Sequence, residues 1–237
     1  MWPFKKTTTI RDSGILNGIT DWHSHILPGV DDGVKTMEES LAILSDFEEL
    51  GVRRVWLTPH IMEDYPNTPA DLQKRFGELK AVYAGGIELR LAAENMLDNL
   101  FEERLEANDL LPIGEEGNHL LVETSYYTPP YGMDDMIESI FSKGYFPILA
   151  HPERYRHMDE KEYLKLHERG VKMQVNYLSL VGGYGDQAKK KAEWLLGKGL
   201  IGYAGSDIHR ESVIKLIGES KGEEKRIKML SDVNNNK

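Results

Sequence analysis

The chain has 237 residues, of which 40% are hydrophobic and 29% charged, and its mean hydropathy is −0.47, so it suits one large domain with a charged surface. It has no cysteine, which excludes a disulfide framework, a cysteine-based zinc site and a cysteine nucleophile. The net charge of −10 argues against nucleic acid as a partner, and the sequence has neither a run of about 18 apolar residues nor the apolar region of a secretory signal. We therefore expect a cytoplasmic protein that is not stably inserted in a membrane.

Short apolar runs alternate with amphipathic runs from residue 19 onward. Thr36 and Glu39 have the spacing of a capping box at the start of one amphipathic run, and Gly51 follows its end. Strands that alternate with helices in this way lie parallel and are joined by right-handed crossovers. We predict strands at 19–23, 52–57, 87–93, 119–122, 146–150, 171–175 and 200–204. We predict helices at 36–50, 69–83, 97–107, 133–142, 159–168 and 186–196.

These seven strand–helix units favour an α/β fold in the form of a closed or nearly closed barrel, although an open sheet is also compatible. We expect an N-terminal arm at 1–18, the barrel at 19–217 and a charged C-terminal helix and tail at 218–237. Trp2 and Phe4 could contact a membrane or a partner protein, but a loosely packed arm is the simpler interpretation. Symmetric assembly is common among soluble enzymes, so an oligomer stays open.

Side chains that can bind metal follow six of the seven predicted strands. In a β/α barrel the C-terminal ends of the strands converge on one face, where active sites lie. Alternate residues of an extended strand point the same way, so each His-x-His or Asp-x-His pair can reach one ion. Imidazole and carboxylate suit zinc, manganese or iron, and more than about four ligands imply at least two ions. The candidates are His23, His25, His60, Glu94, Glu123, His151, Asp207 and His209, with Glu94 or Glu123 as a possible bridge.

Each candidate also has an ordinary explanation. A lone His-x-His pair is often a surface coincidence, and His151 before Pro152 could be a core histidine. Asp31 and Asp32 before Gly33 look like an ordinary turn. These explanations leave the shared position at strand ends unexplained, so we favour metal binding.

Two arginines lie close to the candidate ligands. Arg154 is three residues after His151, and Arg210 directly follows His209. Either could be an ordinary surface cation, but beside a metal cluster a guanidinium group matches the oxygens of a phosphate. The remaining histidines lie at the start of a strand, in a loop and in a helix, and we assign none of them to metal: His119, His157 and His167.

At these residues the sequence resembles the PHP (polymerase and histidinol phosphatase) superfamily. Within it, the sequence is similar to the bacterial tyrosine-protein phosphatases of capsule and exopolysaccharide operons, the CpsB/YwqE type. Residues 21–33 (DWHSHILPGVDDG) and 150–155 (AHPERY) are the specific motifs, whereas the motifs at 58–60, 93–95 and 205–209 are weaker when taken alone. The resemblance extends from about residue 19 to residue 209.

The resemblance implies a distorted (β/α)7 barrel of the PHP fold that holds two or three divalent metal ions, with manganese first and iron or zinc as alternatives. It implies Arg154 as the phosphate-binding arginine, and a second arginine for which Arg210 is the nearest candidate. It also implies Asp32 rather than Asp31 as a ligand, a choice that spacing leaves open. The implied ligand set is His23, His25, Asp32, His60, Glu94, Glu123, His151, Asp207 and His209.

The implied reaction is hydrolysis of phosphotyrosine, with a bacterial tyrosine kinase that controls capsular or exopolysaccharide synthesis as the substrate. We expect attack by a metal-bound hydroxide, charge compensation by Arg154, and protonation of the leaving oxygen by Asp207 or a nearby histidine. Five tyrosines after strand ends could stack on the substrate ring, although packing is the simpler role for most of them. They are Tyr126, Tyr127, Tyr131, Tyr155 and Tyr177.

Two alternatives stay open at this stage. One is a phosphatase for histidinol phosphate or another small molecule that uses the same metal site. The other is a regulatory module that binds metal without catalysis. A shallow, open site would favour phosphotyrosine proteins, and a deep, lidded site would favour a metabolite.

Overall fold

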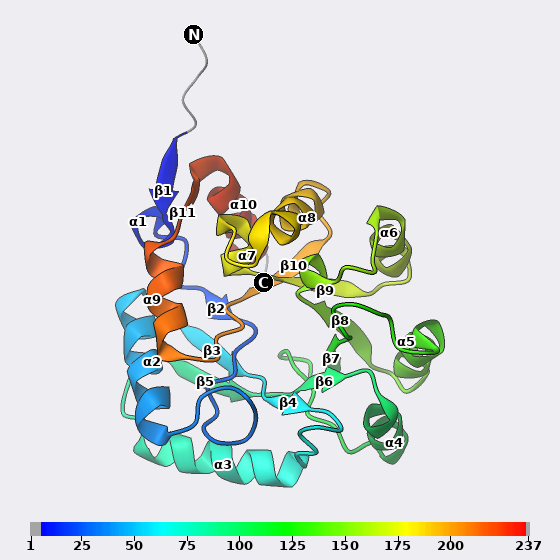
Figure 1. The fold of residues 1–237 in the computed structure, drawn as a ribbon. Coiled ribbons are helices and arrows are strands. Elements are labelled where there is room, and N and C mark those ends of the chain that lie inside the picture. The colour runs from blue at the N-terminus through cyan, green and yellow to red at the C-terminus, as the bar shows by residue number, and fades with distance from the viewer. Residues whose placement is uncertain (1–5, 236–237) are drawn as a thin grey trace.

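The computed structural model describes residues 6–235 and has a mixed α/β fold built on parallel strands (Figure 1). Trp2 and Phe4 lie outside the described residues. One sheet has six parallel strands in the order β10-β9-β8-β7-β6-β4, and a second has three in the order β2-β3-β5. The strands are β2 (Thr20–Asp21), β3 (Arg54–Leu57), β4 (His60–Ile61), β5 (Glu88–Leu91), β6 (Glu94–Met96), β7 (His119–Glu123), β8 (Phe146–Ala150), β9 (Lys172–Asn176) and β10 (Ile201–Gly205).

Helices surround the strands in Figure 1. The six predicted helices are all present, and the first begins with the predicted capping box, in which Thr36 Oγ1 accepts from Glu39 N at 3.2 Å. Shorter turns of helix follow β8 and β9, at the expected site face. The helices are α2 (Met37–Glu49), α3 (Pro69–Val82), α4 (Asn99–Ala107), α5 (Met133–Ser142), η1 (Pro152–Arg154), α6 (Glu160–Glu168), α7 (Tyr177–Val181), α8 (Gly185–Gly197) and α9 (Glu211–Glu219).

Two short strands that were not predicted, β4 and β6, follow the second and third predicted strands, which correspond to β3 and β5. β3 pairs with β5 in the small sheet, whereas β4 pairs with β6 in the large sheet. Pro59 lies between β3 and β4 and has no N–H to donate to a strand ladder. His60 and Glu94 are paired in register at the start of β4 and β6.

The segment after β2 lies beside the end of β10. Trp22 N donates to Ala204 O at 3.2 Å, and His25 N donates to Ile208 O at 2.9 Å. In the other direction, Asp207 N donates to His23 O at 2.8 Å. These bonds fix the first and last groups of candidate ligands next to each other.

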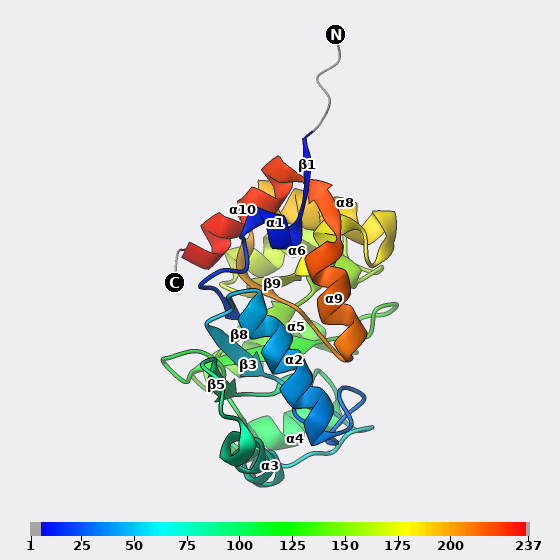
Figure 2. The same ribbon diagram turned by 90° about the vertical axis from the view of Figure 1, so that its left-hand side faces the viewer.

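The two ends of the described chain pack together. β1 (Thr7–Thr9) pairs antiparallel with β11 (Lys221–Glu223). α1 (Ile10–Ser13) lies beside α9 and α10 (Glu224–Asn235), as Figure 2 shows, and Ile10 and Leu16 are buried in the core. The described part of the predicted arm is thus in contact with the predicted tail, while the boundaries of the three parts stay a prediction.

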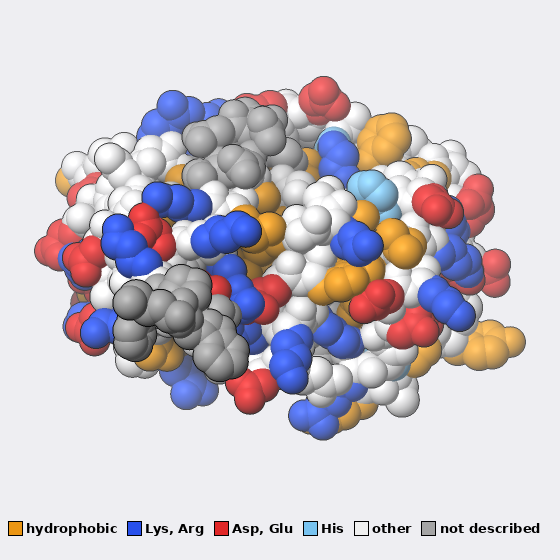
Figure 3. All heavy atoms as spheres, turned by 90° about the horizontal axis from the view of Figure 1, so that it is seen from above, with side chains coloured by type: hydrophobic (Ala, Val, Ile, Leu, Met, Phe, Trp, Pro, Cys, Tyr) orange, Lys and Arg blue, Asp and Glu red, His pale blue; other side chains and the backbone are white. Residues whose placement is uncertain are grey.

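The helical face of α8 and α10 is of mixed charge. Figure 3 shows Lys and Arg side chains lying among Asp and Glu side chains on this face. Every helix of the described residues is too short or too polar to cross a lipid bilayer.

Candidate active site

The nine predicted metal ligands lie at or after the C-terminal ends of β2, β3, β5, β7, β8 and β10. β4 and β6 begin with His60 and Glu94, and β7 ends with Glu123. The other ligands lie in the loops that follow β2, β8 and β10. All but two are buried, the exceptions being Asp32 and His209. The structure therefore brings together residues that are far apart in the sequence.

Glu94 lies among four histidines. Its Oε2 atom is 3.1 Å from Nε2 of His23 and 3.2 Å from Nε2 of His25. The same oxygen is 3.1 Å from Nδ1 of His60, and Oε1 is 3.1 Å from Nε2 of His151. A carboxylate whose two oxygens face different imidazoles has the geometry of a bridging ligand.

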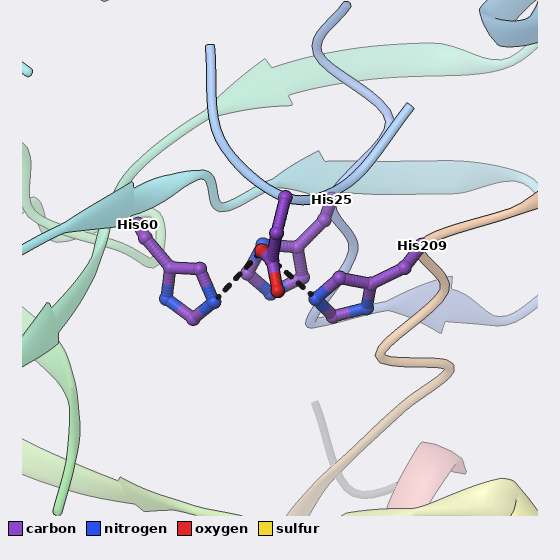
Figure 4. A group of neighbouring side chains, drawn as sticks. His25, His60 and His209 are labelled. Carbon is purple, nitrogen blue, oxygen red and sulfur yellow. Dashed lines mark ion pairs between the residues drawn. The ribbon is translucent and has the colours of Figure 1, made fainter. Parts of the chain in front are cut away.

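The ring of His60 lies between two further carboxylates. Oε1 of Glu123 is 3.0 Å from Nδ1 of His60. Beyond the other ring nitrogen, Oδ1 of Asp32 is 3.5 Å from Nε2 of His60 and 3.5 Å from Nε2 of His209. Figure 4 shows the imidazoles of His25, His60 and His209 grouped together. The dashed lines mark the ion pairs of His60 and His209 with the carboxylate between them.

Four groups of these side chains each have ligand atoms within 4.8 Å of one another. His23, His25, His60 and Glu94 each belong to more than one group. Shared ligands are expected when metal ions are neighbours. The groups are His25, Asp32, His60 and His209; His23, His25 and Asp207; His23, Glu94 and His151; and His60, Glu94 and Glu123.

Several buried ligand atoms lie close to one another but form no hydrogen bond of normal geometry among residues 6–235. They include both carboxylate oxygens of Glu94, Oε1 of Glu123 and Nδ1 of His60. A buried polar atom without a partner is costly, and a carboxylate oxygen is satisfied by a cation. Imidazole nitrogen and carboxylate oxygen are donors that zinc, manganese and iron accept. The residues present therefore fit a metal cluster.

The hydrogen bonds of His23 and His25 determine which ring nitrogen is free. The amide nitrogen of Gln174 donates to Val175 O, so its Oε1 atom accepts from Nδ1 of His23 at 2.8 Å. The carboxylate of Asp31 accepts from Nδ1 of His25 at 2.9 Å. In the neutral rings the two Nε2 lone pairs therefore face each other at 3.0 Å. Two lone pairs at this distance repel unless a cation lies with them.

The electrostatics of the site also favour positive charge. Burial lowers the pKa of His23, but the carboxylates of Glu94 and Asp207 raise it more, so that it reaches about 9. The pKa of His60 reaches about 10, because Glu94 and Glu123 outweigh its burial. The same histidines hold the pKa of the Glu94 carboxyl well below its usual range in spite of burial. Metal ions would replace the protons that the histidines hold because of the neighbouring carboxylates.

Unusual backbone conformations direct ligands into the site. His151 and Asp207 have φ angles of 32° and 51°, in the left-handed region that few residues other than glycine adopt. Gly33 allows the chain to return close to His25, because a Cβ atom there would lie 2.2 Å from His25 O. Strain of this kind is often found at functional sites.

A comparison with known protein families shows to which family this chain belongs. The sequence model described as "Capsular polysaccharide synthesis, CpsB/CapC" matches residues 19–215. The chain belongs to the CpsB/CapC family. Among its CpsB/CapC relatives, the tyrosine-protein phosphatase YwqE of Bacillus subtilis is 30% identical over 195 residues, which cover 80% of this chain and 76% of the relative. The tyrosine-protein phosphatase CpsB of Streptococcus pneumoniae is 30% identical over 202 residues, which cover 80% and 82%.

Solved structures agree with this membership of the CpsB/CapC family. Crystal structures of YwqE from B. subtilis and CpsB from S. pneumoniae are described as those of unique metal-dependent tyrosine phosphatases. The matching chain has a TM-score of 0.76 and 25% identity, over 90% of this chain and 87% of that one. A lactonase from Listeria monocytogenes has a TM-score of 0.51 and 15% identity, over 87% and 83%, which shows a related fold alone.

Sequence reasoning about this CpsB/CapC protein missed the residues behind the ligands. Asp31 accepts from His25 and from the backbone N of His60 at 3.0 Å, so it orients ligands, while Asp32 lies in a ligand group. Asp21 accepts from Ser206 N at 2.7 Å and Ser206 Oγ at 2.6 Å. Burial raises the pKa of Asp21 to about 7, although these hydrogen bonds lower it. Asp21 and Asp31 could have been found because they lie within the specific motif at 21–33. Gln174 is a single residue within a strand, and nothing in the sequence indicates its contact with His23.

The two predicted arginines of this CpsB/CapC protein lie in different surroundings. Arg154 lies between the rings of Tyr126 and Tyr184, at 4.3 and 4.5 Å from their centroids. Its Nη1 atom is 2.7 Å from Oδ2 of Asp207. Arg210 caps α9, is exposed, and forms no ion pair with a carboxylate of the described residues.

The five tyrosines suggested for ring stacking divide into two kinds. Tyr155 and Tyr177 are 0% and 1% exposed and pack in the core. They are therefore not available to a substrate ring, and for them the simpler packing interpretation holds. Tyr127 and Tyr131 are 65% and 100% exposed, and Tyr126 packs against an arginine.

Proposed function

We propose that this chain is a metal-dependent protein-tyrosine phosphatase of capsule or exopolysaccharide synthesis. The observation that carries the proposal is the convergence of overlapping ligand groups around Glu94, with Arg154 held 2.7 Å from Asp207 of the same cluster. Relatives in the family are named tyrosine-protein phosphatases, which supports the same chemistry. An arginine beside a metal cluster suits a phosphate group.

The proposed cofactor is a cluster of two or three divalent ions, with manganese first and iron or zinc as alternatives. When bound, such ions lower the pKa of a coordinated water and hold phosphate oxygens. The ligands proposed for them are His23, His25, Asp32, His60, Glu94, Glu123, His151, Asp207 and His209.

The chain's own residues bind and orient the phosphate. The guanidinium of Arg154 is directed by two aromatic faces and by Asp207, so it can offset charge in the transition state without reorganising. Arg210 is the proposed second phosphate contact. Histidine and arginine charges hold the pKa of Asp207 below its usual range despite burial, which favours its role as a ligand over that of an acid. The contacts of His209 with Asp32 and Asp207 raise its pKa in spite of burial, so the carboxylates favour positive charge at this position as well.

A closed, distorted (β/α)7 barrel of the PHP fold is the proposed architecture. The hydrogen bonds that join the segment after β2 to the end of β10 support closure between the first and last strands. Closure would direct all C-terminal strand ends to one mouth, as the nine ligands require.

The proposed substrate is phosphotyrosine on a protein, with a bacterial tyrosine kinase in the cytoplasm as the partner. A cavity of about 370 Å³ lies beside Arg154, and its rim includes Tyr127, which is 65% exposed. An open rim of this kind favours a peptide over a small metabolite.

The test is phosphate release from a phosphotyrosine peptide and from histidinol phosphate, each with and without manganese. The proposal requires manganese-dependent release from the peptide that is lost in His23→Ala. His167→Ala is the matched control, because His167 is exposed on α6 and belongs to none of the ligand groups. Release from histidinol phosphate alone would favour a metabolic phosphatase, and bound metal without release from either substrate would favour a regulatory module.

A further inference from the structure

The cavity beside Arg154 contains a second arginine that the proposed reaction does not use. Arg156 is exposed and lies over the ring of Tyr127, with its Cζ atom 5.0 Å from the ring centroid. Its backbone N donates to Tyr126 O at 2.7 Å, which fixes where the side chain starts. No carboxylate within residues 6–235 forms an ion pair with Arg156, although the chain has 39 acidic residues.

The acidic residues of the cavity wall do not neutralise this arginine. Oε1 of Glu153 accepts from Asn176 N at 3.0 Å and from Ser179 Oγ at 2.6 Å, and Glu153 is buried. Asp186 is exposed on the wall and, among the described ion pairs, is joined to neither arginine. The cavity therefore has one arginine that is paired with Asp207 of the ligand cluster and one that is free to meet an anion.

The position of Arg156 matches a neighbour of the phosphotyrosine. It is two residues after Arg154, and two residues span at most about 7 Å. In an extended peptide, residues i and i+2 are separated by about the same distance and point the same way. With the phosphate at Arg154, the next side chain on that face would lie near Arg156.

A second cavity extends this surface away from the cluster. It has a volume of about 300 Å³ and shares Arg156 and Gln187 with the first cavity. Its lining includes Lys190 and Trp194, which offer a positive charge and an apolar ring. It also includes Glu160 and Asp159, and the Asp159 carboxylate caps the start of α6. The two cavities adjoin at Arg156 and Gln187, so the loops after β7 and β8 and the start of α8 line a surface that a peptide can follow.

We propose that Arg156, supported by Tyr127, binds an anionic side chain within two residues of the phosphotyrosine. The preferred substrate is then an acidic or multiply phosphorylated phosphotyrosine peptide, in which the anion is a carboxylate or a second phosphate. This inference rests on the proposed function, because it places the phosphotyrosine at Arg154. Arg156 acts on specificity and takes no part in the bond that breaks.

Binding to peptides that are not hydrolysed tests the inference separately from catalysis. The manganese-loaded protein is titrated with peptides that carry phosphonodifluoromethyl phenylalanine in place of phosphotyrosine. Each has Gln, Glu or a second phosphotyrosine analogue at the second position before or after it. We expect the Glu and doubly anionic peptides to bind about fivefold more tightly than the Gln peptide at low salt, and the difference to shrink as salt is added.

In Arg156→Gln the ratio of dissociation constants should fall to about one. Arg53→Gln is the matched control, because Arg53 is also an exposed arginine without an ion pair among the described residues, and it should retain the ratio. A ratio near one in the wild type, or a ratio that survives in Arg156→Gln, would overturn the inference. Absence of phosphate release from hydrolysable peptides would refute the proposed function alone, since the binding ratio is read without turnover.

Discussion

Nη1 of Arg154 and Oδ2 of Asp207 are 2.7 Å apart, so one carboxylate serves both the arginine and the ligand cluster. The same Oδ2 accepts from Nδ2 of Asn176 at 2.7 Å, and Oδ1 is 3.6 Å from Nε2 of His23. A phosphate that arrives at the cluster therefore meets an arginine whose direction is already fixed. This arrangement reduces the reorganisation needed during the reaction.

Replacement of this arginine should reduce turnover without removing the metal. We expect Arg154→Ala to lower kcat about 100-fold, as the loss of one transition-state donor does in other enzymes. Arg154→Lys should rescue little, because lysine lacks the planar fork that pairs with a carboxylate and stacks between Tyr126 and Tyr184. Steady-state kinetics and metal analysis check this, with Arg53→Ala as control. Unchanged kcat in Arg154→Ala would remove Arg154 from the mechanism.

Replacement of the neighbours Asp31 and Asp32 should weaken metal binding in both cases but affect the stability of the metal-free protein differently. In Asp31→Asn an amide N–H would face the N–H of His25 or of the His60 backbone, so we expect about 10–100-fold weaker metal binding or activity. The metal-free variant should also melt about 5 °C lower, because buried donors lose their acceptor. Asp32→Asn should lower the metal content while the metal-free melting temperature falls less than in Asp31→Asn, since Asp32 is half exposed and lies 3.5 Å from His60 and His209. Calorimetry with metal analysis separates the two, and equal melting losses would contradict these roles.

These two aspartates also illustrate what the sequence could and could not predict. Helix α2 was predictable because its signals, Thr36 and Glu39, are local and lie at fixed spacing. The ligands were predictable because they recur at strand ends. The roles of Asp31 and Asp32 depend on where the loop turns back at Gly33, which is a tertiary property. The strand β4 after Pro59 was missed because it has only two residues, and its pairing with β6 in the large sheet depends on partners distant in sequence.

Removal of the metal should destabilise the protein. The cluster brings buried carboxylates together, and a ligand that binds only the folded state at about 100 times its Kd stabilises it by about 2.7 kcal/mol. For a chain of this size that corresponds to a change in Tm of about 5–10 °C. We expect chelation to lower the Tm by this amount and to abolish phosphate release, and added manganese to restore both. A chelated protein with an unchanged Tm and full activity would exclude the cluster.

The metal-free protein should lose stability as the pH rises. The folded pKa of His23 is about 9, above its usual value of 6.5, because the carboxylates of Glu94 and Asp207 outweigh burial. The stabilising proton is fully present below pH 6.5 and is lost as the pH approaches 9. Thermal melts of chelated protein across this range should show a falling Tm, and the fall should be smaller in His23→Gln. The manganese-loaded protein should show less of this fall, because the metal replaces the proton. Parallel curves for chelated and loaded protein would contradict this explanation.

Arg210 should contribute to phosphate binding, but less than Arg154 does. It is exposed and lacks an ion pair within the described chain, so it is free to meet a phosphate oxygen beside His209. We expect Arg210→Ala to lower kcat/KM about tenfold, less than Arg154→Ala, because water screens an exposed charge. If both arginines bind one phosphate, the effects of Arg210→Ala and Arg154→Ala should be non-additive in the double variant. Additive effects would place Arg210 on another part of the substrate, and unchanged kcat/KM with intact metal content would leave Arg154 as the sole predicted phosphate contact.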